Sequence, residues 1–163
     1  MEIILSECFS CCKECGVLPP NLDLRSISSL KLKCSTCCFE VFVDELTRVG
    51  HAHALNVELL SLDISNSDFT KYIKNSAFIH LLRSCPKLCE LDISLKSLKL
   101  NPEDFVLMED LSSVARTLKM LCTLKFCRLK GLESEMQSIK VFLACFLGIE
   151  EVIDHSSTLD SLG

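Results

Sequence analysis

The chain has 163 residues, of which 48% are apolar, and this is enough for the core of one domain of ordinary size. Its 22 acidic and 17 basic residues give a net charge of −5 and are spread along the sequence, which excludes the concentrated basic face of a nucleic-acid-binding protein. The longest apolar stretch, Val141 to Ile149, is too short to span a bilayer. We therefore expect neither a nucleic acid nor a membrane as a partner.

Twelve cysteines would indicate disulfide bonds in a small secreted protein. Residues Met1 to Leu5, however, lack the basic segment and the long apolar run of a secretory signal peptide. We therefore expect a reducing compartment, the cytoplasm or the nucleus, in which the thiols stay reduced.

The N-terminal segment, residues 1–21, is rich in cysteine and ends with Pro19-Pro20. We expect it to be a cap or an irregular segment in front of the main domain. Residues 22–153 contain no low-complexity tract or linker and are predicted to form that domain. Residues 154–163 are small and polar, and they should form a frayed tail.

One motif returns about every thirty residues along this domain. It has the pattern apolar-x-x-apolar-x-apolar, and its fourth positions are Leu30, Leu62, Leu91 and Leu124. A weaker fifth copy, at 149–152, follows after a similar interval. Such a recurrence is typical of leucine-rich repeats, in which stacked units bury one continuous core. The four clear copies are Ile27–Leu32, Leu59–Ile64, Leu88–Ile93 and Leu121–Phe126.

The segments between the motifs have the period of amphipathic helices. The tetrapeptide Asn101–Asp104 predicts the start of the third helix, with a cap, then a proline, then acids in the first turn. Pro86 should end the second helix, and Gly131 and Gly148 should bracket the fourth. The apolar positions that indicate the four helices are Phe39, Phe42, Leu46 and Val49; Phe69, Ile73, Ala77 and Leu81; Phe105, Met108, Leu111, Ala115 and Leu118; and Leu132, Met136, Ile139, Leu143 and Phe146.

Strand motifs that alternate with helical segments predict an α/β fold with parallel strands. We expect a leucine-rich-repeat solenoid, an open curved parallel sheet of four to five irregular repeats with helices on its convex side. The strands should centre near Leu30, Leu62, Leu91, Leu124 and Val152. The residues expected to be buried together in the core are Leu62, Ile64, Leu91, Ile93, Leu124 and Phe126.

Two stretches are similar to a known family. Residues Ile79–Ile93 resemble the repeat core "LL-x-x-C-P-x-L-x-x-L-x-I" of plant F-box/leucine-rich-repeat proteins, and Leu121–Ile153 is similar to the FBD segment that closes many of them. The resemblance covers most of residues 22–153 and implies the substrate-recognition part of a ubiquitin-ligase receptor. Residues 1–21 lack the pattern of the F-box, the helical module that docks onto the adaptor of a cullin ligase. The resemblance therefore implies a module that binds a protein partner without recruiting the adaptor.

The polar residues that alternate with the apolar ones on each strand should line the concave face of the solenoid. The two middle repeats carry acids at these positions and the outer two carry bases. Solvated strand positions are polar in any case, but adjacent acids would also select a partner with a basic patch. The residues predicted to bind the partner are Lys31, Asp63, Glu90, Asp92 and Lys125.

The spacing of four cysteines supports an alternative function, that of a zinc-binding module. Cys12-x-x-Cys15 and Cys34-x-x-Cys37 are separated by an interval within the range typical of structural zinc sites, and four thiolates so placed can surround the ion. Cysteine is also a common core residue, which explains Cys34 and Cys37 equally well. Because twelve cysteines make a chance match common, we favour no metal and no cofactor, with zinc as the alternative.

The sequence contains no Gly-rich phosphate-binding loop and no nucleophile elbow. The four histidines, at 51, 53, 80 and 155, lie in no recognisable nucleophile context. We therefore expect no enzyme activity, no catalytic residue and no small-molecule substrate.

Overall fold

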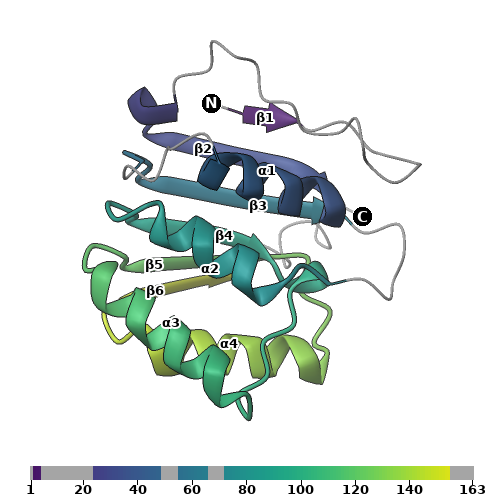
Figure 1. The fold of residues 1–163 in the computed structure, drawn as a ribbon. Helices are drawn as coiled ribbons and strands as arrows, with labels where there is room; N and C mark the ends of the chain where they lie inside the picture. Colours follow the sequence, from purple (N-terminus) through teal and green to yellow (C-terminus); the bar gives the residue numbers. More distant parts are fainter. Residues whose placement is uncertain (1, 5–23, 49–54, 66–71, 155–163) are drawn as a thin grey trace.

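The computed structural model describes residues 2–4, 24–48, 55–65 and 72–154 (Figure 1). Parallel strands form one six-stranded sheet in which each strand lies beside the one that precedes it in the chain. This arrangement confirms the α/β fold with a parallel sheet. The strands are β1 (Glu2–Ile4), β2 (Ser29–Ser35), β3 (Leu59–Ser65), β4 (Glu90–Ser94), β5 (Thr123–Cys127) and β6 (Glu151–Asp154).

Helices follow β2, β3, β4 and β5 and lie on the same side of the sheet (Figure 1). Two short 3-10 helices accompany them, η1 (Leu24–Ser26) before β2 and η2 (Leu95–Ser97) directly after β4. Within the described ranges, no helix has both the length and the apolar character needed to cross a membrane. The α-helices are α1 (Thr36–Arg48), α2 (Asn75–Arg83), α3 (Phe105–Thr117) and α4 (Glu133–Cys145).

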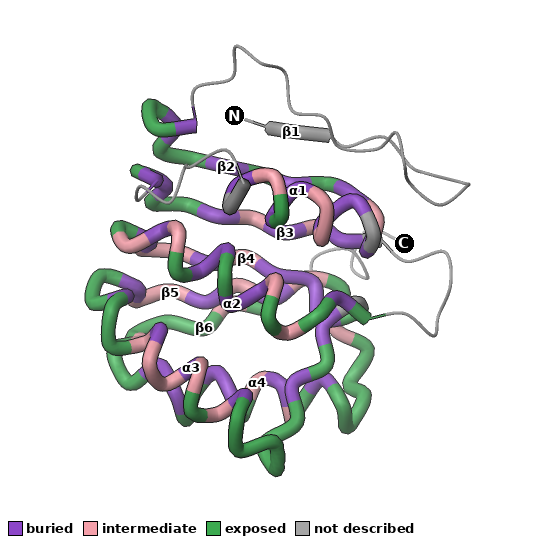
Figure 2. The backbone as a smooth tube through the Cα atoms, in the orientation of Figure 1, coloured by how far each residue is buried: buried purple, intermediate pink, exposed green. Residues whose placement is uncertain are grey.

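The expected core is confirmed. Leu62, Ile64, Leu91, Ile93, Leu124 and Phe126 are each at most 3% exposed. On β4 and β5 they alternate with more exposed residues, and the tube coloured by burial shows such changes along the strands (Figure 2). Phe142 of α4 packs against this core, because the centroid of its ring lies about 6 Å from those of Phe78 on α2 and Phe126 on β5.

The backbone between repeats follows one hydrogen-bonding scheme. In four successive strand connections, the carbonyl of the residue before a strand accepts hydrogen bonds from two adjacent N–H groups of the next repeat. These acceptors, at positions 28, 58, 89 and 122, form a carbonyl ladder along the start of the sheet. The acceptor carbonyls, each followed by its donors, are Ser28 with Glu58 and Leu59, Glu58 with Cys89 and Glu90, Cys89 with Cys122 and Thr123, and Cys122 with Glu150 and Glu151.

The register corrects the alignment of the second repeat. Leu30 lies opposite Leu60 and not opposite Leu62, and Leu60 in turn lies opposite Leu91. The sequence motif therefore aligns β3 two positions too late. Leu60, Leu62 and Ile64 are all apolar, so the pattern could not choose between these registers. A shift of two positions keeps each side chain on the same face, and the expected buried and solvated faces are therefore unaffected.

Strand β1 lies within residues 1–21 and pairs with β2 at the edge of the sheet. The structure corrects one expected boundary, the start of the third helix. Helix α3 begins at Phe105, because Asp104 is its N-cap and accepts a hydrogen bond from the Leu107 N–H at 3.1 Å. Asn101 instead forms a turn in front of the helix, where its side-chain oxygen accepts from the Glu103 N–H.

Some of the apolar residues expected to face the core from the helices are buried, and others are exposed. Phe105 is 86% exposed, while Phe39, Phe42, Leu46 and Leu81 are buried as expected. Ile73 is buried just before α2 begins, and Val49 and Phe69 lie outside the described residues.

Helix α4 is rotated relative to the face that its apolar residues predicted. Leu132, Met136 and Leu143 are exposed, whereas the polar residues Glu135 and Ser138 are buried. Val141, Phe142 and Cys145 complete the buried side of α4. Both buried polar groups are hydrogen-bonded: Ser138 Oγ accepts from the buried Leu100 N–H at 3.2 Å, and the Glu135 carboxylate accepts from backbone N–H groups before the helix. A pattern that scores only apolar residues cannot detect such partners.

Candidate functional site

The residues predicted to bind a partner all lie on the face of the sheet turned away from the helices. We call this surface the open face. Lys31 is exposed there, and Asp63, Glu90, Asp92 and Lys125 are half-buried. The register places Lys31, Ser61, Asp92 and Lys125 in one row across β2, β3, β4 and β5. The open face comprises Ser29, Lys31, Lys33, Leu59, Ser61, Asp63, Glu90, Asp92, Thr123, Lys125 and Cys127.

Alternation along the strands also assigns Ser65 and Ser94 to this side of the sheet. Ser94, at the end of β4, is only 4% exposed and is therefore buried. The side chain of Ser65, at the end of β3, lies outside the described part of the chain.

An ion pair joins the centre of the open face. Lys125 Nζ lies 2.7 Å from Glu90 Oε1, and this contact crosses diagonally from β5 to β4. Both side chains are about a quarter exposed. The hydrogen bond to Glu90 raises the pKa of Lys125, burial opposes this, and the negative charges of Glu90, Asp92 and Glu151 raise it further. The two side chains are therefore held as a charged pair.

A second ion pair connects strands that are not neighbours. The guanidinium of Arg128, directly after β5, donates two hydrogen bonds to the Asp63 carboxylate on β3, at 3.2 and 3.4 Å. Asp63 is 17% exposed and Arg128 is 54% exposed. The two residues are 65 positions apart in the chain, and sequence reasoning missed Arg128 because no local pattern links it to Asp63.

These ion pairs correct the expectation of an acidic stripe. Asp63 and Glu90 each carry a cationic partner, so their charges do not simply add to that of Asp92. The carboxylates still affect a neighbouring thiol. Burial raises the pKa of Cys127, and the negative charges of Asp92 and Asp63 raise it further. The open face is therefore a pattern of opposed charges.

The zinc alternative gains no support from the described residues. Cys34 is 2% exposed and lies in the hydrophobic core, and Cys37 lies in α1 with its side chain outside the description. Cys12 and Cys15 fall outside the described ranges. Where the structure describes side chains, no three His, Cys, Asp or Glu residues are grouped to hold a metal. The described cysteines that form no disulfide are Cys34, Cys38, Cys85, Cys89, Cys122, Cys127 and Cys145.

No protein-family model, no curated protein and no solved structure matches the chain. The described part of the chain has two features that bear on function, the open face with its ion pairs and the regular succession of strands beneath it.

Proposed function

We propose that the chain is a non-enzymatic protein-interaction module, a leucine-rich-repeat solenoid that binds a protein partner on the open face. The carbonyl ladder is the observation that carries this proposal. Its acceptors, at positions 28, 58, 89 and 122, recur about every thirty residues, as the sequence motif does, and repeat the same pair of hydrogen bonds in each connection. A unit that recurs in this way forms an extended surface, because each repeat contacts only its neighbours.

The open face is better suited to binding a folded protein than to binding a small-molecule substrate. Its residues come from β2, β3, β4 and β5, and its charges are held in place by cross-strand pairs. Such a fixed pattern of both signs favours a partner with complementary charges, chiefly through partner choice and association rate. Lys31 and Lys33 extend the face at the β2 side, where both are exposed.

The resemblance to plant F-box/leucine-rich-repeat proteins supports the same proposal. On this interpretation, the chain corresponds to the substrate-recognition part of a ubiquitin-ligase receptor and works in the cytoplasm or the nucleus. Because the resemblance does not include an F-box, we propose that the chain captures its partner without recruiting the ligase adaptor and without a cofactor.

Comparative affinity capture from plant extract tests the proposal. Charge reversal of Asp63 and Asp92 would not give a clean test of binding, because a lysine at position 63 would face Arg128. The neutral positions Ser61 and Thr123 are better, because both are half-buried at the centre of the open face. The variant Ser61→Arg/Thr123→Arg should lose partner proteins that the unchanged chain retains, by at least tenfold in quantitative mass spectrometry.

The matched control is Ser76→Arg/Ser113→Arg, which adds the same two charges on α2 and α3. It should retain the partners. Direct binding of the purified partner to the three proteins then confirms the result. Equal loss in both variants, or equal retention in both, would contradict the open face as the binding surface, and capture of the ligase adaptor would contradict the F-box-free interpretation.

A further inference from the structure

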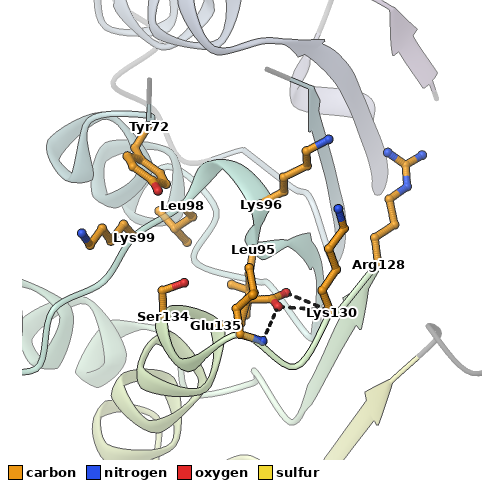
Figure 3. Close-up of a pocket in the computed structure, with 10 residues that line it drawn as sticks. Tyr72, Leu95, Lys96, Leu98, Lys99, Arg128, Lys130, Ser134 and Glu135 are labelled. Carbon is orange, nitrogen blue, oxygen red and sulfur yellow. Dashed lines mark hydrogen bonds between the residues drawn. The ribbon is translucent and has the colours of Figure 1, made fainter. Parts of the chain in front are cut away.

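A small pocket opens beside the carboxyl ends of β4 and β5 (Figure 3). It has a volume of about 170 Å³ and lies between η2, the segment after β5 and the first turn of α4. A cavity of about 150 Å³ can hold a molecule of the size of benzene, so this pocket has room for a small ligand. Its lining residues are Tyr72, Leu95, Lys96, Leu98, Lys99, Arg128, Lys130, Leu132, Ser134 and Glu135.

The pocket is basic, although the chain as a whole has a net charge of −5. Four of its ten lining residues are cations, Lys96, Lys99, Arg128 and Lys130, and one is a carboxylate, Glu135. Arg128 is paired with Asp63 on the open face, which leaves three lysines against Glu135. Figure 3 shows Lys96, Lys130 and Arg128 on one side of the pocket and Tyr72 with Lys99 on the other. Like charges gathered in a concave site raise the local concentration of an anion.

The carboxylate of Glu135 has a structural task that accounts for its presence. It is buried and accepts hydrogen bonds from the N–H groups of Lys130, at 3.0 and 3.3 Å, and Leu132, at 3.0 Å. These bonds fix the segment that carries Lys130 at the start of α4, where a negative charge is favoured by the helix dipole. Glu135 therefore holds the pocket wall in position, and the cations still outnumber it.

The backbone at Arg128 is a second sign of function. With a φ of 58°, Arg128 is the one non-glycine residue in the described ranges that has a positive φ. Side chains other than Asn, Asp and Gly rarely adopt this conformation, and strained residues gather at binding sites. Here the strained conformation lets one guanidinium line the pocket and bind Asp63 on the open face.

We propose that this pocket binds a small phosphate monoester. The three lysines, with the hydroxyl groups of Tyr72 and Ser134, offer several donors to the acceptor oxygens of a phosphate, which carries nearly two negative charges. Arg128 adds a guanidinium at the pocket edge that is already paired with Asp63. A ligand with one carboxylate group would use few of these donors. Leu95, Leu98 and Leu132 supply an apolar wall for the organic group of the ester. The pocket adjoins the open face, because Arg128 lines the one and binds Asp63 on the other, but the proposed ligand does not depend on the proposed protein partner.

Tyr72 provides a direct measurement. The chain contains one tyrosine and no tryptophan, so fluorescence excited at about 275 nm reports on the pocket alone. Titration with butyl phosphate should change this fluorescence saturably, and at least tenfold more tightly than butyrate at matched ionic strength. Inorganic phosphate should bind more weakly than butyl phosphate, because it has no group to contact the leucines.

The variant Lys96→Gln/Lys130→Gln should weaken butyl phosphate binding at least tenfold. Its control, Lys119→Gln/Lys140→Gln, removes the same charge from positions outside the pocket and should leave the affinity unchanged. Circular dichroism checks the fold, and Lys99→Gln serves as a milder variant. Equal responses to butyl phosphate and butyrate, equal affinity of butyl and inorganic phosphate, no saturation, or equal loss in both double variants would each overturn the proposal.

Discussion

The two faces of the same strands differ in how their residues are held. Towards the helices, Leu91 and Leu124 lie in aliphatic rows that are almost completely buried. On the open face, Glu90 and Lys125 are held by pairing across strands, and Asp63 is held by Arg128 from beyond the sheet. Burial of alternate residues is a local property of a strand, whereas the charge pairs depend on which strands are neighbours. The two faces should therefore respond very differently to substitution.

The largest expected difference concerns the cysteines. Burial raises the pKa of the Cys85 thiol from 9.0 to about 12, which lowers its thiolate fraction at pH 8 about a thousandfold. Alkylation of Cys85 should be slower by at least that factor in the native protein than in urea, whereas the half-buried Cys127 should react in the native state. Peptide mass spectrometry measures both, and rapid native labelling of Cys85 would contradict its burial.

The same shift has a consequence for stability. The native state keeps the Cys85 proton at a pH where the unfolded chain has lost it, so the free energy of unfolding should fall as the pH rises from about 9 towards 12. Urea unfolding across this range, with Cys85→Ala as the reference, isolates the contribution of this thiol.

Substitution of one leucine on each face compares them directly. Leu91→Ala should lower the free energy of unfolding by about 3 kcal/mol, through lost burial and a residual cavity, because Leu91 is fully buried. Leu59→Ala is the matched control, since Leu59 is 43% exposed on the open face of β3, and it should cost less than about 1 kcal/mol. A loss below about 1 kcal/mol for Leu91→Ala in urea unfolding would remove this residue from the core.

Ser138 tests whether a polar group on the buried side is needed there. Ser138→Ala leaves the buried Leu100 N–H without its acceptor, and it should cost about 1 to 2 kcal/mol. Ser134→Ala, at an exposed position of the same helix, should change stability by less than about 0.5 kcal/mol. If both variants unfold at the same urea concentration, the hydrogen bond contributes nothing measurable.

The smallest expected effect is that of the open-face ion pair. A double-mutant cycle of Glu90→Gln and Lys125→Met should give a coupling below about 1 kcal/mol, and salt should reduce it. Because the pKa of Lys125 is raised, the coupling should be fully present below pH 10.5 and disappear as the pH rises beyond it. A coupling that persists when Lys125 is deprotonated would show that packing, not charge, joins the two side chains.

Several elements of the fold could be predicted from local periodicity. Strands β2 to β6 lie where the motif placed them, and the alternation assigned Leu62 and Asp63 to the correct faces. The register of β3 could not be predicted, because three successive inward positions of that strand are apolar. The burial of Ser138 on α4 could not be predicted either, because its hydrogen-bond partner lies 38 positions away.

The candidate sites divide in the same way. The open-face residues were found from alternation alone, since side chains on a strand point to opposite faces by turns. Their ion pairing was not predicted, because Arg128 reaches Asp63 only once β3, β4 and β5 lie side by side. The basic pocket had no signal at all, since its lining comes from separate segments around Tyr72, η2, the end of β5 and α4.

What the sequence by itself determined is thus the order of the strands and helices and the division of each strand into a buried and a solvated side. These follow from short-range periodicity, which any window of the chain contains. Only the tertiary structure decided the register, the charge pairs and the pocket. These depend on contacts between residues far apart in the chain, and such contacts exist only after the strands and helices have packed together.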